Sequence, residues 1–313
     1  VINRVCSSGL AAINFAANLI MTGEMDIAVA GGTENMSQTP YLLNYRARFD
    51  INRPGDVEFR DGLLEGLTCP VNRYHMGVCA GNITERYEIS REDQDELALM
   101  SHQRAVAAMK NDRFTGQIVE IDVPQRGKDP ITVTADEGPM EDTSLERLSR
   151  LRPAFKKGGT VTAGNSSSIN DGAAAVVIMS QERASAMGIK ARLRWHARGI
   201  AGVDPAMMGI GPVPAVRNVL KRSSMTLKDV GLIELNEAFA VQALYCIREL
   251  GLDMNRTNVN GSGISMGHPL GATGAVMTVK LMDEMELRDV EVGLVTMCVG
   301  GGQGVATIFE RAY

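Results

Sequence analysis

Two short glycine-containing segments, far apart in the sequence, carry residues that could act together as a nucleophile and its base. Cys6 lies in NRVCSSGL, where an apolar strand-like run meets an apolar helix-like run. At a helix start, free backbone N–H groups and the helix dipole favour thiolate, the nucleophilic form of cysteine. His268 lies in GHPLGATG, whose glycines permit close backbone approach and whose Pro269 suits a first helical turn. A small buried core cysteine and a structural histidine remain the alternatives at these two positions.

A second cysteine and an asparagine extend this set of candidate residues. Cys298, in TMCVGGGQG, ends an apolar strand pattern and is followed closely by three glycines. Glycines at that position allow backbone N–H groups to face a cavity, as an oxyanion hole requires. Asn236, in LNEAFA, ends another apolar strand pattern and carries a neutral amide that can orient a water molecule. Because α/β sheets gather strand ends in one crevice, we expect these residues to share a site.

The elements that must position these residues follow a strand–helix–strand order. Residues 1–5 predict the end of a buried strand, 10–21 a buried helix and 26–32 a short buried strand. This order is the unit of a parallel sheet. A similar unit returns over 267–285 and 292–304, which predicts an internal duplication and therefore an α/β fold with two related, doubly wound halves. The first half has only five residues before its glycine turn, so we expect its initial segment to be missing.

Between the two units the sequence becomes polar and is punctuated by proline and glycine. Residues 90–109 predict a charged helix with a capping box that begins at Ser90. Residues 129–139 predict a short strand and a turn, and 169–180 predict a return to a buried strand of the first half. We interpret the intervening region, 36–169, as a cap inserted over the sheets.

Composition excludes several classes of function. The 313 residues carry a net charge of −5, which provides no electrostatic reason to bind nucleic acid or an anionic membrane. No apolar run approaches the roughly 20 residues that a membrane span needs. Five widely spaced cysteines do not form a disulfide pattern, so we expect a reducing, cytoplasmic setting.

At this point the chain resembles the thiolase family. The matching segments run in order along the whole chain and are NRVCSSGL, VAGGTENMS, YHMG, LRPAF, TVTAGNSSSINDGAA, MGIGPVPA, NEAFA, GHPLGATGA and CVGGGQG. The resemblance implies the thiolase fold, with two doubly wound α/β halves and a loop domain inserted in the first. We expect a first half over 1–35 and 170–186, an inserted domain over 36–169 and a second half over 187–313. It also implies that the roughly 80–90 residues that family members have before the nucleophile's strand are absent here.

The resemblance assigns a role to each candidate. Cys6 carries the acyl group as a thioester, His268 activates it, and Cys298 is the acid/base at the α-carbon of the second acyl-CoA. Backbone N–H groups of Cys6 and Gly300 form one oxyanion hole, whereas His268 and a water held by Asn236 form the other. Covalent capture splits the reaction into two easier steps, and one oxyanion-hole donor contributes about 3–4 kcal/mol of barrier lowering.

Coenzyme A contacts follow in the same way. The positions that match the family's pantetheine path are Leu67, His75, Met76, Ala163, Ser167, Met208, Ala238 and Phe239. Independently, a basic cluster on this acidic chain could meet the polyphosphate end, or could be a solvated face; its members are Arg147, Arg150, Arg152, Lys156 and Lys157. Coenzyme A thioesters are expected as substrates, with no permanently bound cofactor.

Some positions depart from the family or suggest other chemistry. Met140 stands where many relatives have an arginine that reaches the nucleotide end, and Ser262 and Gly263 stand where glycine and alanine are usual. Cys69, His75 and Cys79 could supply three zinc ligands, but the spacing is unusual and a fourth ligand is not evident, so we predict no metal site.

From these observations we expect the chain to be an acyltransferase that condenses two acetyl-CoA molecules reversibly into acetoacetyl-CoA and coenzyme A. YHMG favours this short-chain reaction, because His75 and Met76 would help to close a small acyl pocket. A longer-chain 3-ketoacyl-CoA thiolase of fatty-acid breakdown is the near alternative. An inactive, truncated thiolase-like protein that only assembles is the alternative of another class. We expect a homodimer or homotetramer.

Overall fold

The larger of the two main sheets is formed by the C-terminal third of the chain. The computed structural model describes residues 1–43, 47–50 and 54–312. The sheet has four strands in the order β7-β10-β9-β8, with bounds Leu193–Gly202, Gln303–Arg311, Val292–Val299 and Leu232–Leu235. Only β8 and β9 are parallel, and the other two pairs are antiparallel. The expected doubly wound half is therefore a mixed sheet, since β10 returns from β9 by a tight glycine turn instead of a crossover helix.

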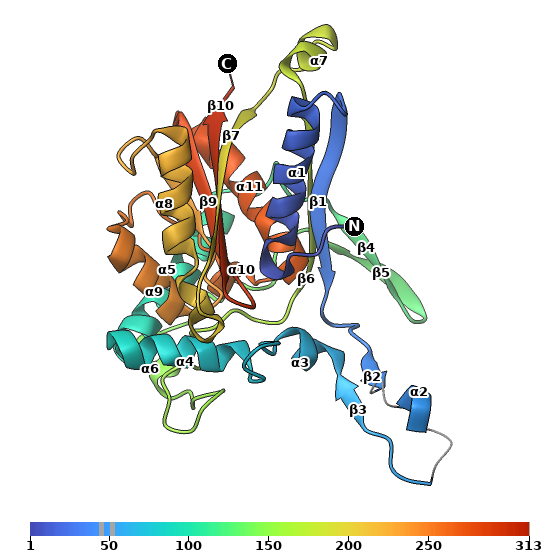
Figure 1. Cartoon of the computed structure of the whole chain (residues 1–313), viewed down its shortest axis with the longest axis vertical. Helices are drawn as coiled ribbons and strands as arrows, with labels where there is room; N and C mark the ends of the chain where they lie inside the picture. The colour runs from blue at the N-terminus through green and yellow to red at the C-terminus, as the bar shows by residue number, and fades with distance from the viewer. Residues whose placement is uncertain (44–46, 51–53, 313) are drawn as a thin grey trace.

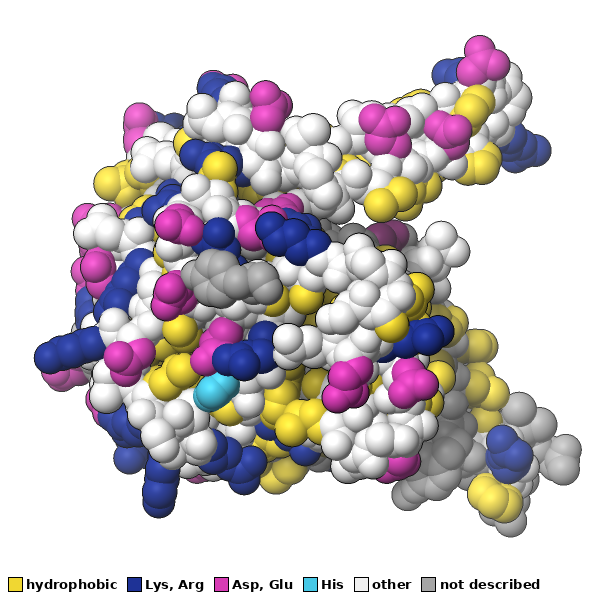
Figure 2. Space-filling view, turned by 90° about the horizontal axis from the view of Figure 1, so that it is seen from above, with side chains coloured by type: hydrophobic (Ala, Val, Ile, Leu, Met, Phe, Trp, Pro, Cys, Tyr) yellow, Lys and Arg dark blue, Asp and Glu magenta, His cyan; other side chains and the backbone are white. Residues whose placement is uncertain are grey.

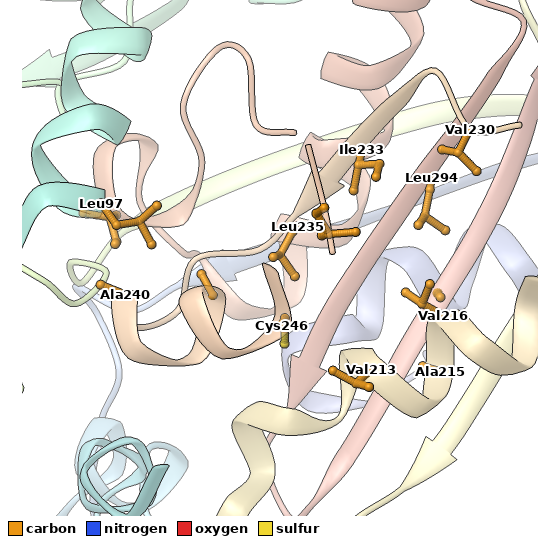
Figure 3. Packing of buried hydrophobic residues seen from close by; sticks show 14 of the residues in the cluster. Leu97, Val213, Ala215, Val216, Val230, Ile233, Leu235, Ala240, Cys246 and Leu294 are labelled. Atoms are coloured by element: carbon orange, nitrogen blue, oxygen red, sulfur yellow. The ribbon is translucent and has the colours of Figure 1, made fainter. Parts of the chain in front are cut away.

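Helices cover both faces of this sheet, which explains why β8 and most of β9 are buried along their length. These helices are α8 (Pro212–Ser223), α9 (Ala240–Leu250) and α11 (Leu270–Leu287), with the short η2 (Pro205–Ile210) and α10 (Gly263–Met266) beside them. Figure 3 shows the core between β8, β9, α8 and α9, where Ile233, Leu235 and Leu294 of the strands face Val213 and Val216 of α8. This core holds the end of β8 in place.

The second main sheet belongs to the N-terminal half and contains only β1 (Ile27–Asn35) and β6 (Asp171–Met179). The two strands are antiparallel and stay in register along their full length. In both strands exposed positions alternate with more buried ones, so the expectation of fully buried strands is wrong. One face packs against α1 (Ser8–Met21) and α11, whereas no described element covers the other face.

Helices α1 and α11 pack against each other beside this sheet, and glycines allow the close approach (Figure 1). A Cβ on Gly274 would lie 2.4 Å from the backbone nitrogen of Leu10, and a Cβ on Gly9 would lie 2.9 Å from that of Ala275. The two helices follow the two glycine-containing segments that carry Cys6 and His268. Their contact therefore brings the two halves of the predicted site together.

The region between the halves is irregular, and its elements between residues 59 and 87 run along one end of the molecule (Figure 1). It contains β2 (Tyr41–Leu43), α2 (Ala47–Asp50), β3 (Phe59–Asp61), α3 (Gly62–Gly66), α4 (Met76–Tyr87), α5 (Arg91–Lys110), β4 (Ile121–Gln125), β5 (Lys128–Val133) and α6 (Leu145–Ser149). The predicted helix over 90–109 and the short strand within 129–139 are confirmed as α5 and β5. Ser90 caps α5 by accepting a hydrogen bond from the backbone N–H of Asp93 at 3.0 Å.

The first residues of the chain differ from the sequence prediction. Residues 1–4 form no strand, and a 3₁₀ turn, η1 (Val5–Ser7), precedes α1. The short α7 (Gln181–Ala186) follows β6. Among the described residues, no helix is both long and apolar enough to cross a membrane.

Candidate active site

One narrow cavity of about 80 Å³ collects most of the residues that the sequence singled out. Cys6, His268, Cys298 and Gly300 all line it, although they come from three separate segments of the chain. Of the eight predicted coenzyme A contacts, seven line the same cavity: Leu67, His75, Met76, Ser167, Met208, Ala238 and Phe239. Ala163 does not line it and is exposed. Two sulfurs and one imidazole thus face a common space.

Cys6 lies in η1, directly after a residue with an unusual backbone. Val5 has a φ of +48°, a left-handed conformation that costs a β-branched residue about 1–2 kcal/mol. The turn places Cys6 beside Gly300, and the backbone N–H groups of these two residues lower the pKa of the Cys6 thiol. They are the two donors that the family resemblance implies for an oxyanion hole.

The thiol of Cys6 differs from the sequence expectation in its ionisation. The helix start was expected to favour thiolate, but burial raises the pKa of Cys6 to about 11, against the lowering effect of the two backbone N–H groups. The carboxylate of Glu34 raises this pKa further. The resting residue is therefore a neutral thiol, and it needs a base before it can attack.

Cys298 ends β9 and is fully buried. Burial raises the pKa of its thiol well above the usual value, and the neighbouring Cys6 adds to the effect. The glycines that follow are needed for the turn, because Gly301 and Gly302 have φ values of +85° and +89°. The same turn places Gly300 beside Cys6, whose pKa is lowered by the Gly300 backbone N–H.

His268 lies just before α11 and is 4% exposed. Its Nδ1 lies 2.7 Å from the Oγ1 of Thr273, and its backbone N–H donates to the Oδ1 of Asn170 at 3.2 Å. Burial lowers the pKa of His268 to about 4, so the ring is neutral at physiological pH. A neutral imidazole beside a neutral thiol can accept the thiol proton.

The start of α11 is held by a carboxylate from the other half of the chain. Pro269 provides no side-chain cap, and the Oε2 of Glu34, at the end of β1, accepts from the N–H of Gly271 at 3.0 Å. A negative charge is favoured at a helix N-terminus. Glu34 therefore fixes the turn that carries His268.

Asn236 follows β8, does not line the cavity and is fully buried behind it. Its Nδ2 lies 3.4 Å from Nδ1 and 3.3 Å from Nε2 of His268. The N–H bond and the lone pair of the two ring nitrogens point away from each other in the ring plane. The Asn236 Nδ2 is about equally near to both nitrogens, so it lies over the face of the ring. The Oδ1 of Asn236 has no hydrogen-bond partner, which leaves an acceptor for a water or substrate. Gly263 makes room for this amide, since a Cβ there would lie 2.7 Å from Oδ1.

Aromatic rings form one wall of the cavity. His75 stacks on Phe155 with ring centroids 4.6 Å apart, and Phe155 meets the edge of Phe239 at 6.0 Å. His75 also caps α4, because its Nδ1 accepts from the N–H of Gly77. Met76 reaches across to the glycine turn, where a Cβ on Gly300 would lie 2.8 Å from its Cε. Within the described ranges, no three His, Cys, Asp or Glu side chains converge as a metal ion would require.

The basic cluster is largely neutralised by its neighbours. Arg147 pairs with Asp142, Arg150 with Glu146 and Lys156 with Glu85. Arg152 and Lys157 are exposed, and the described residues provide no ion pair to either. On the face shown in Figure 2, acidic and basic side chains are interspersed and neither sign forms a large continuous patch.

Three residues at the site were missed by the sequence analysis. Thr273 lies within the quoted GHPLGATG, so its position one turn after His268 was a usable signal. Glu34 lies within VAGGTENMS, and Asn170 lies within SSSINDG. Nothing in the local pattern of these two segments indicates contact with the histidine turn, because that contact depends on how β1 and β6 pack beside α11.

The fold is α/β with two related halves, and one cavity holds a buried cysteine, a second cysteine and a neutral histidine. These features define a class of enzymes that transfer acyl groups through a thioester. Comparison with known proteins identifies the family. Residues 1–182 match the family model described as Thiolase, N-terminal domain, and residues 188–311 match Thiolase, C-terminal domain. The chain belongs to the thiolase family and is an acyltransferase of the thiolase type.

Individual relatives agree with this assignment. A probable acetyl-CoA acyltransferase of Staphylococcus aureus strain MRSA252 is 49% identical over 311 residues, which are 99% of this chain and 78% of that protein. The Bacillus anthracis acetyl-CoA acetyltransferase structure matches with a TM-score of 0.95 and 46% identity, over 99% of this chain and 78% of that one. Human mitochondrial 3-ketoacyl-CoA thiolase matches with a TM-score of 0.96 and 40% identity over the same shares, and a structure of that enzyme with CoA also matches.

Proposed function

We propose that this chain catalyses the reversible condensation of two acetyl-CoA molecules into acetoacetyl-CoA and coenzyme A. The observation that carries the proposal is the meeting of Cys6, His268 and Cys298 on one cavity, with two backbone N–H groups at the Cys6 sulfur. A thioester α-proton is a weak acid, so the developing enolate must meet fixed donors in a site that excludes water. The buried cavity supplies that environment.

In the first step, His268 accepts the Cys6 thiol proton and the sulfur attacks the acetyl carbonyl carbon. The N–H groups of Cys6 and Gly300 stabilise the tetrahedral oxyanion. Coenzyme A leaves as its thiol, with the proton returned from His268. The acetyl group is then held on Cys6 as a thioester.

In the second step, Cys298 first gives its thiol proton to the neutral His268, and the thiolate then removes a proton from the methyl group of the second acetyl-CoA. The resulting carbanion attacks the acetyl carbon on Cys6 and a carbon–carbon bond forms. The Cys6 sulfur leaves and takes the proton held by His268. His268 and a water held by the free Oδ1 of Asn236 stabilise the enolate oxygen. The reverse direction is thiolysis, in which Cys298 protonates the departing carbanion.

Substitution of each cysteine tests these roles separately. Cys298→Ala is expected to become acetylated on Cys6 by acetyl-CoA, as mass spectrometry would detect, but to lose thiolysis by at least about a thousandfold. Cys6→Ala is expected to lose both. Cys246→Ala is the matched control, because Cys246 is also fully buried but does not line the cavity. Thiolysis by Cys6→Ala at the wild-type rate would contradict the proposal.

A longer-chain 3-ketoacyl-CoA thiolase is the second candidate. The structures of an acetyl-CoA acetyltransferase and of a 3-ketoacyl-CoA thiolase match this chain with similar TM-scores, 0.95 and 0.96. The short-chain reading is supported by the wall of His75, Phe155 and Phe239 and by Met76, which together narrow the cavity. A profile of kcat/KM against acyl length separates the two. Equal values for four- and ten-carbon substrates would exclude the short-chain preference.

We also propose that pantetheine follows the cavity wall from Leu67 to Phe239 and that Arg152 and Lys157 meet the polyphosphate, since the other basic residues of the cluster are paired. No resident cofactor is needed for this chemistry. The domain boundaries 1–35 with 170–186, 36–169 and 187–313 are part of the same proposal. Coenzyme A affinity of Arg152→Ala, compared with Arg150→Ala, tests the phosphate contact.

A homo-oligomer in the cytoplasm completes the proposal. All five cysteines are free thiols, as a reducing compartment maintains. Light scattering measures the assembly. Thiolysis by the assembled chain would exclude the inactive, purely assembling alternative.

A further inference from the structure

We propose that Thr273 is a positioning residue that sets the tautomer of His268, with the proton on Nδ1 and a free lone pair on Nε2. This inference rests on the proposed role of His268 as the base for Cys6. Thr273 lies in the first turns of α11, five residues after the histidine. The tautomer follows from the single proton that the threonine hydroxyl can donate.

The hydroxyl of Thr273 has one proton, and a backbone carbonyl lies within its reach. Oγ1 lies 2.8 Å from the carbonyl oxygen of Pro269, which can only accept and which also accepts from the N–H groups of Ala272 and Thr273 at 2.9 Å each. The same Oγ1 lies 2.7 Å from Nδ1 of His268. When the hydroxyl donates to the carbonyl, Oγ1 can only accept from the ring, and Nδ1 then carries the hydrogen.

The surroundings offer Nδ1 one other polar neighbour, and it is farther away. Thr273 and His268 are each 4% exposed, so bulk water does not supply an alternative partner. The Nδ2 of Asn236 lies 3.4 Å from Nδ1 and about as near to Nε2, at 3.3 Å, whereas the Oγ1 of Thr273 lies 2.7 Å from Nδ1 alone. The backbone N–H of His268 is already used by Asn170. Thr273 is therefore the nearer partner of Nδ1 among the residues that the structure describes.

This contact has a consequence for the reaction. When Nε2 accepts the thiol proton, the charged ring keeps donating from Nδ1 to Oγ1, and a hydrogen bond from a charged donor is stronger than one from a neutral donor. The ring therefore stays in one orientation through both proton transfers. Thr273 has the orienting role that a carboxylate has in a Ser-His-Asp triad, but without adding a negative charge beside Cys6.

Three variants separate this role from a purely structural one. Thr273→Val keeps the shape and removes the hydroxyl, and it should lower kcat for thiolysis about tenfold to a hundredfold with little change in KM. Thr273→Ser restores the hydroxyl and should recover most of the rate. Thr278→Val is the matched control, because Thr278 is buried in the same helix and donates to the Gly274 carbonyl at 2.8 Å, with no histidine beside it. It should share the loss of stability and keep kcat.

The tautomer itself can be observed without activity. The chain has only four histidines, so labelling them with ¹⁵N gives a simple spectrum, and the signals absent from His268→Gln identify His268. Correlation to the two ring carbon-bound protons distinguishes Nε2, which couples to both, from Nδ1. We expect the unprotonated nitrogen to be Nε2 in the wild type and both tautomers to be populated in Thr273→Val.

Each outcome decides a different question. An unprotonated Nδ1 in the wild type, or equal kcat for Thr273→Val and the wild type, would overturn the role of Thr273. Full activity of His268→Gln would instead overturn the proposed catalytic role of the histidine, whatever the spectrum shows.

Discussion

Replacing Asn258 with alanine should weaken both the fold and the active site, because this side chain holds the end of β8. Its Oδ1 accepts from the N–H of Leu235 at 2.8 Å, and its Nδ2 donates to the Leu235 carbonyl and to Oε1 of Glu237, each at 2.8 Å. Asn258 is 1% exposed, so water does not replace these bonds. Leu235 directly precedes Asn236, whose amide lies on His268.

The size of the effect follows from which groups lose their partners. The Leu235 carbonyl keeps a hydrogen bond from Ser262 at 2.9 Å, and the Glu237 carboxyl keeps Ser101. The Leu235 N–H and one oxygen of the buried Glu237 lose theirs, at about 1–3 kcal/mol each. Asn258 also has a φ of +50°, where alanine costs about 1–2 kcal/mol more than glycine. The sum is about 3–8 kcal/mol, against a total stability of roughly 5–15 kcal/mol.

Urea unfolding at fixed protein concentration, followed by CD, measures this loss. Asn258→Gly should be about 1–2 kcal/mol more stable than Asn258→Ala, because glycine removes only the backbone strain. Asn255→Ala is the control, since Asn255 is exposed three residues away, and it should change stability by less than about 0.5 kcal/mol.

Thiolysis should fall in both Asn258 variants under conditions where they remain folded, because the position of Asn236 is no longer fixed. A loss below about 1 kcal/mol in Asn258→Ala, or a loss equal to that of Asn255→Ala, would refute the reasoning.

Three further predictions concern charge, pH and packing. Glu34→Gln keeps the acceptor at the start of α11 but removes a charge that raises the pKa of Cys6. Alkylation of Cys6 by iodoacetamide at pH 8 should therefore become about two- to fivefold faster, and a slower rate would contradict this. Because the pKa of His268 is lowered in the folded protein, the unfolded state binds more protons between pH 6.5 and 4, and the free energy of unfolding should fall by up to about 3 kcal/mol as pH decreases through that window. In urea titrations, His268→Gln should show a smaller fall. An equal fall would exclude the histidine as the cause. Gly304→Ala places a Cβ 1.9 Å from the Gly211 carbonyl oxygen and should lower the free energy of unfolding by more than about 2 kcal/mol in the same assay. Gly202→Ala, on the neighbouring strand, meets nothing within 4 Å and should lower it by less than about 1 kcal/mol. Similar losses in both variants would show that close packing at Gly304 is not the cause.

Local features were readable from the sequence because they depend on residues close together in the chain. The helix over 90–109 appears as α5 with its Ser90 cap, since capping is a contact between residues three apart. The glycines after Cys298 were recognised as a turn that exposes backbone N–H groups, and two of them have the positive φ that such a turn needs. The motif order identified the family, and the site residues that it singled out all line the cavity except Ala163 and Asn236.

Features that depend on distant segments were not readable in this way. Strand β1 pairs antiparallel with β6, and β10 pairs antiparallel with β7 and β9. Antiparallel and parallel pairing leave the same apolar pattern in the sequence. The exposed outer face of β1 and β6 likewise depends on what packs there, and the expectation of buried strands was wrong for that reason.

The chemistry of the site shows the same division. The sequence by itself determined which side chains are present and which of them begin helices or end strands, because backbone geometry and hydrogen bonding are local. Only the tertiary structure decided that Cys6 is a neutral thiol and that His268 is a neutral base, because burial outweighs the helix start in setting both pKa values. Burial is a property of the assembled halves: the packing of α1 on α11 removes water from both residues at once.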